Sequence, residues 1–182
     1  MKRRCWLGLF GLLVGLGSVA ATAQSSTVAR ILQMEDERSL GDGELERLVR
    51  SGEPEIRIRA IRAAGRIGDA AITGAVVTAL TDELPEIRRE AAFALSEIED
   101  GSAFDALVGA LVDPDRPTRF KAIEALGKLR DPRAEPALRA ILTAEASDVE
   151  EKGAVVLQIW RFRAPESLAH RHTPCRWRRE RR

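Results

Sequence analysis

The sequence predicts an all-α protein: a right-handed α-solenoid of stacked antiparallel helix pairs with a repeat of 31 residues. Nearly the same motif occurs three times at this spacing, as PEIRIRAIRAAGRIGD from residue 54, PEIRREAAFALSEIED from residue 85 and RPTRFKAIEALGKLRD from residue 116. Within each copy the apolar residues recur every three or four positions, which is the spacing of an amphipathic helix. No stretch keeps the alternation that a half-buried strand requires, so a stack of helical units is the architecture that fits.

The first half of each unit is predicted to be a helix that buries small residues. Pro85 and Pro132 stand where the first turn of a helix tolerates proline. The matching columns, each member 31 residues from the next, are Ala60, Ala91 and Ala122; Ala63, Ala94 and Ala125; Ile67, Ile98 and Leu129; and Asp69, Asp100 and Asp131. Alanine at these positions lets neighbouring helices approach closely, so each unit is expected to pack against the one before it.

The second half of each unit is predicted to be a shorter helix that returns antiparallel to the first. Its columns are Leu45, Val76, Leu107 and Leu138, and Val49, Leu80, Leu111 and Leu142. A looser fourth copy continues the step of 31, aligning Val149, Gly153, Leu157 and Trp160 with Ile56, Ala60, Ala64 and Ile67. Residues 26–38 have a partial pattern of the first helix and are expected to form an N-terminal cap.

The motifs IRREAAFALSEIED and TRFKAIEALGKLRD resemble the HEAT-like repeats of phycobilisome lyases, over residues 40–162. In such repeats an Arg and an Asp hydrogen-bond between neighbouring units. The resemblance therefore implies a structural, inter-repeat role for Arg57, Arg88, Arg119, Asp82 and Asp113. The chain departs from the pattern at both ends, with Ser51 in the Asp column and Glu150 in the Arg column. The family includes bilin lyases, enzyme subunits and scaffolds, so the resemblance implies the fold more than the function.

The N-terminus has the order of a secretory signal peptide. Lys2, Arg3 and Arg4 precede an apolar run, and Ala21-Thr22-Ala23 forms a cleavage pattern. We therefore predict a signal peptide at 1–23, the solenoid at 24–162, and export to the periplasm or the extracellular space. The alternative is an uncleaved membrane anchor, because no charge occurs between Arg4 and Arg30. After cleavage no membrane association is expected.

The C-terminal segment, 163–182, differs from the repeats in composition. It contains seven Arg against two Glu, lacks an apolar stripe, and is predicted to be a basic, disordered tail. One hypothesis is that a shifted reading frame or a truncation has replaced further repeats, or a catalytic domain; the other is a genuine tail for anionic surfaces. His170, His172 and Cys175 could in principle bind zinc, but three ligands on one such segment are a weak signal. No metal or other cofactor is predicted.

Charge and residue types limit the function classes. The net charge of +1 conceals a predicted solenoid of −7, which argues against a specific nucleic-acid binder. Residues 24–169 contain no His, Cys or Tyr, so Ser-His-Asp and Cys-His catalysis are excluded from the repeats. The Asp and Glu residues fall at turns and helix starts, where they cap helices. We therefore predict that the chain is not an enzyme.

The second helices suggest a binding surface, because in such stacks they usually line the side on which extended partners bind. A stripe along them is apolar in the middle units and charged at its ends, which is the anatomy of a protein-binding patch. Its members are Thr73, Val77, Phe104, Val108, Glu135 and Arg139. The alternative is that these residues belong to the core, because Phe104, Leu107, Val108 and Leu111 also have the spacing of a buried stripe.

Together these features predict an exported, non-catalytic scaffold that binds an unknown protein partner. One alternative is the N-terminal repeat region of a truncated or frame-shifted exported enzyme, for example a peptidyl-prolyl isomerase. A bilin lyase-like protein is a further alternative, which an export signal does not suit.

Overall fold

A computed structural model describes residues 24–145 and 147–163. All regular structure in these two ranges is helical, as predicted. The predicted signal peptide and all but the first residue of the basic tail, including His170, His172 and Cys175, lie outside the described residues.

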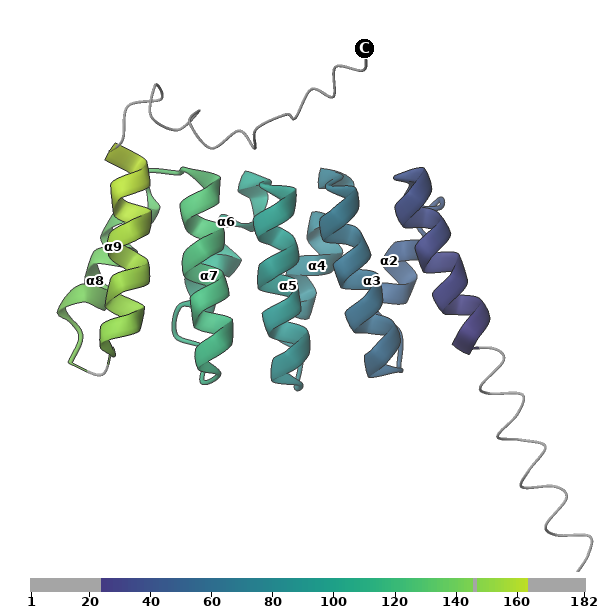
Figure 1. Ribbon diagram of the computed structural model, residues 1–182, viewed down its shortest axis with the longest axis horizontal. Coiled ribbons are helices and arrows are strands. Elements are labelled where there is room, and N and C mark those ends of the chain that lie inside the picture. The colour runs from purple at the N-terminus through teal and green to yellow at the C-terminus, as the bar shows by residue number, and fades with distance from the viewer. Residues whose placement is uncertain (1–23, 146, 164–182) are drawn as a thin grey trace, which may run out of the picture.

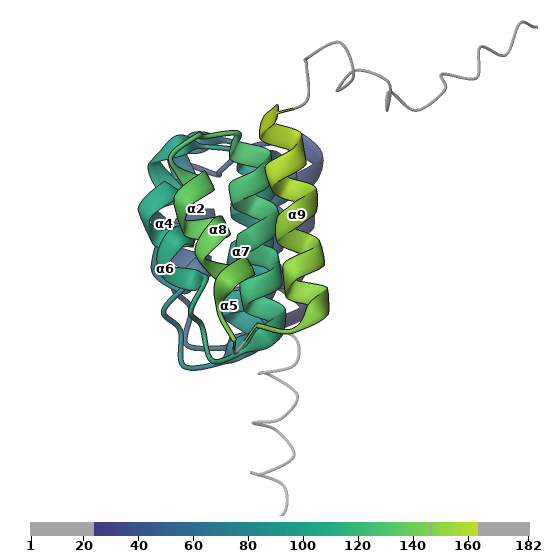
Figure 2. The ribbon, with the colours of Figure 1, turned by 90° about the vertical axis from the view of Figure 1, so that its left-hand side faces the viewer.

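The helices form two layers (Figures 1 and 2). One layer holds the long helices: residues 24–37, α3 (Pro54–Ile67), α5 (Pro85–Ile98), α7 (Arg116–Leu129) and α9 (Val149–Arg163). The other holds α2 (Glu44–Val49), α4 (Thr73–Ala79), α6 (Phe104–Ala110) and α8 (Ala134–Thr143). Each long helix packs against the next, so the chain is a stack of helix pairs along one axis.

One turn is repeated between the two helices of a unit. Its Asp accepts a hydrogen bond from the backbone N–H two residues later, in Asp69, Asp100 and Asp131 alike. In the first two copies a short 3-10 helix follows, Ala70–Ile72 (η1) or Gly101–Ala103 (η2). The Asp column of the sequence is therefore a turn-forming column. Pro85 begins α5 as predicted, whereas Pro132 lies in the turn before α8.

A single core runs through the stack between the layers. The alanine columns of the first helices and the first Leu/Val column of the second helices are fully buried or nearly so. Ile31 and Met34 extend this core into the N-terminal helix, in agreement with its predicted role as a cap. At the other end Val155 of α9 belongs to it.

The predicted alignment of the fourth unit is wrong. Val149, Leu157 and Trp160 are 87%, 54% and 58% exposed, whereas Val155 is fully buried. The helices α5 and α7 begin 31 residues after their predecessors, but α9 begins 33 residues after α7. The cause is the segment before it, because α8 has ten residues where α4 and α6 have seven. The buried side of α9 is therefore shifted by two positions.

Candidate interaction surface and the contacts that support it

Three arginines join successive units in the same way. Arg88 donates two hydrogen bonds to the carboxylate of Asp113, at 2.8 and 2.9 Å, and a third to the backbone carbonyl of Asp82 at 2.9 Å. Arg57 likewise binds the carbonyl of Ser51 and approaches Asp82 to 3.2 Å. A fork of parallel hydrogen bonds to a carboxylate fixes both distance and orientation. Arg57 and Arg88 thus tie the loop before their own helix to the loop before the next long helix.

The environment of Asp113 keeps its side chain ionised. Burial opposes ionisation, but the hydrogen bonds from Arg88 and from the backbone N–H of Asp115 outweigh it, so the pKa of Asp113 lies below its ordinary value. The hydrogen bonds that Arg88 donates to Asp113 hold the pKa of Arg88 above its ordinary value. Both side chains are largely shielded from water, which makes this pair the best-defined contact of the series.

The last arginine uses a partner that the sequence pattern does not show. Arg119 binds the carbonyl of Asp113 and the carboxylate of Glu151, at 2.9 and 2.7 Å. Glu151 lies in the first turn of α9 and is buried. The helix cap is the feature that could have revealed this partner. Asp148 accepts a hydrogen bond from the backbone N–H of Glu151, and Asp115 accepts the equivalent hydrogen bond from the N–H of Thr118.

The layer of second helices contains the predicted binding stripe, but only part of it is accessible. Thr73 and Phe104 are buried, and Arg133 stacks on the ring of Phe104 at 4.2 Å from the ring centre. These two residues belong to the core, as the alternative interpretation of the stripe has it. Val77 and Val108 are half-buried and pack against the core from its outer side.

The half-buried valines of this layer lie in its middle units, and an ion pair lies at its end. Val112, in the turn after α6, is 84% exposed. In α8 the stripe continues as the ion pair of Glu135 with Arg139, at 2.8 Å. The structure therefore brings the accessible members of the stripe onto one layer and keeps the apolar and charged parts apart along it.

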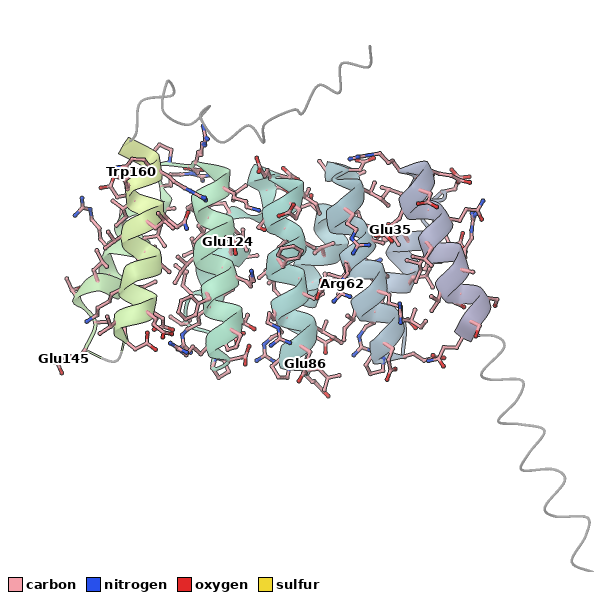
Figure 3. All side chains as sticks on the ribbon, viewed as in Figure 1. Glu35, Arg62, Glu86, Glu124, Glu145 and Trp160 are labelled. Atoms are coloured by element: carbon pink, nitrogen blue, oxygen red, sulfur yellow. The ribbon has the colours of Figure 1, made fainter. Side chains whose placement is uncertain are left out.

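The layer of first helices has a different character, because ion pairs join its neighbouring helices. Arg62 of α3 binds Glu90 of α5 through two hydrogen bonds, at 3.0 and 2.9 Å. Arg66 reaches back to Glu35, and Lys128 of α7 binds Glu97 of α5. Figure 3 labels Glu35 and Arg62 on adjacent helices of this layer. Several of its charged side chains thus already have partners within the chain.

Comparison with known proteins agrees with this architecture. The sequence pattern of HEAT repeats matches residues 42–108 and 75–158, which together cover more than half of the chain. The chain belongs to the HEAT repeat family. Its arginine contacts and two-layer stacking are therefore features of a HEAT array. No curated protein matches the sequence significantly.

Three solved structures resemble the HEAT array in fold. The complex of CpcE and CpcF of phycocyanin lyase from Nostoc sp. PCC7120 has 18% identity and a TM-score of 0.59, over 77% of this chain and 60% of that chain. One engineered protein has 24% identity and a TM-score of 0.53, over 65% of this chain and 61% of that one. Another has 23% identity and a TM-score of 0.52, over 66% and 37%. The chain thus spans less than two thirds of each of these proteins.

Two further observations concern the described ranges alone. No three His, Cys, Asp or Glu side chains in 24–145 and 147–163 lie close enough together to hold a metal ion. Within the same ranges no helix combines the length and the apolar character that crossing a bilayer requires.

Proposed function

We propose that this HEAT array is an exported, non-catalytic scaffold that binds a protein partner on the outer side of its second helices. The observation that carries the proposal is the difference between the two layers. The first helices present several charged side chains that are paired between neighbouring helices, as Arg62 is with Glu90. The second helices of the middle units present half-buried Val77 and Val108, and the turn after α6 presents the exposed Val112.

The energetics favour the second helices as the contact surface. Completing the burial of a partly exposed valine contributes on the order of 1 kcal/mol, whereas a partner on the first helices would have to displace ion pairs. An apolar centre with a charged rim, supplied here by Glu135 and Arg139, also matches the usual anatomy of a protein interface. The phycocyanin-lyase structure is itself a complex of two proteins, which is consistent with a protein partner for this fold.

A scaffold also benefits from the arginine contacts. Because Arg88 links the loop before α5 to the loop before α7, neighbouring units keep a constant spacing. The valines of successive second helices are therefore presented at a fixed separation, which reduces the entropy that a partner loses on binding.

Export is the second part of the proposal and rests on the N-terminal sequence. Lys2, Arg3 and Arg4, the apolar run and Ala21-Thr22-Ala23 have the order that signal peptidases require. Mass spectrometry of periplasmic or secreted material is expected to find Gln24 or Ser25 at the N-terminus. Recovery of the intact chain in the membrane fraction would support the anchor instead.

The partner surface is tested by covalent capture. A photo-crosslinking residue at Val112 should trap the partner in cells that naturally carry the protein, and the same residue at Leu32 should not. Both positions are exposed apolar sites, with Leu32 at 51%, so neither replacement disturbs the core. Equal capture at both positions, or capture at Leu32 alone, would contradict the proposed surface.

The captured partner then allows a binding measurement. The double variant Val77→Glu and Val108→Glu is expected to weaken binding at least tenfold with unchanged helicity, because it places two charges in the apolar centre. Leu32→Glu is the matched control and should bind normally. Loss of helicity in the double variant would assign both valines to the core, and unchanged binding would exclude them from the interface.

A further inference from the structure

The exposed side of α9 carries a stripe of apolar residues at the free end of the described stack. Val149, Gly153, Val156, Leu157 and Trp160 follow each other at helical spacing. Val156 is 56% exposed, and Trp160, labelled in Figure 3, is 58% exposed. Large exposed apolar residues scattered singly are ordinary, but a continuous stripe on one helix indicates a contact surface.

Two members of the stripe, Val156 and Trp160, occupy columns that are buried in the earlier units. With the step of 33, Trp160 corresponds to Gly127, which lies directly against Gln158 of α9. In the earlier units the same column holds Gly65, against Ala94 of α5, and Ser96, which receives a hydrogen bond from Lys128 of α7. All three inner residues are buried. The stripe is thus continuous with the stacking interface of the array.

Trp160 is much larger than any residue that fills this column in the inner units. At Gly65 a Cβ atom would lie only 2.9 Å from the Cα atom of Ala94, and the one side chain that the inner column holds is the small hydroxymethyl group of Ser96. An indole at the equivalent position needs a gap in whatever covers it. Gly153, two turns earlier on the same stripe, is exposed and has open space at its Cβ position, so it leaves room for such a ring.

We propose that this stripe is the interface of a two-fold, end-to-end dimer of the chain, in which α9 packs antiparallel against α9 of a second copy. When the two-fold axis passes between Val156 and Leu157, Trp160 of each copy lies over Gly153 of the other. The same register places Val156 of one copy against Leu157 of the other. The stripe is therefore complementary to itself, which is the requirement for a closed two-fold contact.

Charge supports the same register. On one flank of the stripe the antiparallel arrangement directs Glu150 of one copy towards Arg161 of the other. The side chain of Glu150 is 75% exposed, so it is accessible to a second partner beside Arg116. The apolar contact is thus bordered by opposite charges, which favours this orientation over a parallel one.

The dimer is expected to be weak. A stable interface buries roughly 800 Å² on each partner, and the face of one helix of 15 residues supplies less. Dissociation constants in the micromolar range therefore follow, and association depends on protein concentration.

The test is sedimentation velocity of the purified full chain over a concentration series. The wild type is expected to pass from monomer to dimer without larger species. Trp160→Ala removes the inserted ring, and Gly153→Trp makes two rings collide, so each should weaken association at least tenfold. The double variant should restore association, because each indole ring then again lies over a small residue of the other copy.

Each other occupant of the stripe gives a different result. If the wild type forms oligomers of increasing size and Leu32→Glu abolishes them, the stripe stacks head to tail on the N-terminal helix of another copy. That result would overturn the proposal. A wild type that stays monomeric up to several hundred micromolar would also overturn it, and the stripe would then serve another segment of the chain or another protein. A double variant that remains monomeric while the wild type dimerises would refute the register.

Discussion

At the scale of single residues, Gly65 and Gly74 show that glycine occurs in this stack in two different environments. Gly65 lies where α3 and α5 touch, and a Cβ there would meet the backbone of Ala94 at 2.9 Å. Gly74 of α4 has open space around the same atom. Glycine is otherwise unfavourable within a helix, so only at Gly65 does the packing explain its presence.

This difference gives the first prediction. Gly65→Ala should lower the free energy of unfolding by about 1–3 kcal/mol, because the added methyl group pushes two backbones apart. Gly74→Ala is the control and should be neutral or stabilising by up to about 1 kcal/mol. Urea unfolding monitored by circular dichroism measures both. If Gly65→Ala proves as stable as Gly74→Ala, the close contact between α3 and α5 is wrong.

The second prediction concerns Asp113 and its two hydrogen bonds from Arg88. Asp113→Asn should lower the free energy of unfolding by roughly 2–3 kcal/mol at neutral pH, because it leaves a shielded guanidinium without its counter-charge. Asp36→Asn, on the exposed side of the N-terminal helix, should have almost no effect. Thermal unfolding of the wild type and of the two variants measures these differences in stability.

The pH dependence follows from the lowered pKa of Asp113. Because the folded state holds this pKa below that of the unfolded chain, its contribution is fully present above the unfolded value of about 4. It is lost as the pH falls through the folded value. Stability curves of wild type and Asp113→Asn should therefore converge in acid; a constant difference down to a pH of about 2 would contradict the assignment.

At the scale of elements, the regular columns were predictable from sequence and the fourth unit was not. Ala91 and Leu107 recur because every inner unit buries the same positions, so a gapless alignment finds them. In α9 the apolar residues that satisfy a step of 31, such as Leu157, lie on the exposed side. The residues that enter the core there include polar Glu151 and Gln158, which an apolar pattern cannot identify.

The shifted register gives the third prediction. Val155→Asp should destabilise α9 by more than about 3 kcal/mol, because it buries a charge without a partner. Leu157→Asp should change stability by less than about 1 kcal/mol at low micromolar concentration, where the chain is monomeric. Helicity and thermal unfolding report both effects. If Leu157→Asp destabilises the chain more than Val155→Asp does, the step of 31 applies to α9 and the shift of two positions is wrong.

The binding stripe shows another limit of sequence analysis. Phe104 and Val108 are four residues apart, a spacing that places two residues on the same side of a helix. Yet Phe104 is buried beneath Arg133, whereas Val108 remains half-exposed. The distinction depends on how far each second helix is rotated against its neighbours. Because this rotation is a property of the assembled stack, periodicity within one helix does not determine it.

At the scale of the whole molecule, the two layers of helices differ in the contacts that they make. The first helices hold the units together through small buried residues and through contacts such as that of Arg88 with Asp113. The second helices are shorter, and two of them carry the half-buried Val77 and Val108. The proposed role of this stack is to present a surface of constant spacing.

Hydrogen exchange of the chain, alone and bound to its captured partner, tests the proposed scaffold most directly. The partner should slow exchange in residues 73–82 and 104–113, which contain α4, α6 and the turns after them. Exchange in α3, α5 and α7 should change little, because the partner does not contact their layer. Protection confined to those first helices, or to α9, would show that the partner binds elsewhere and that the second helices are not its surface.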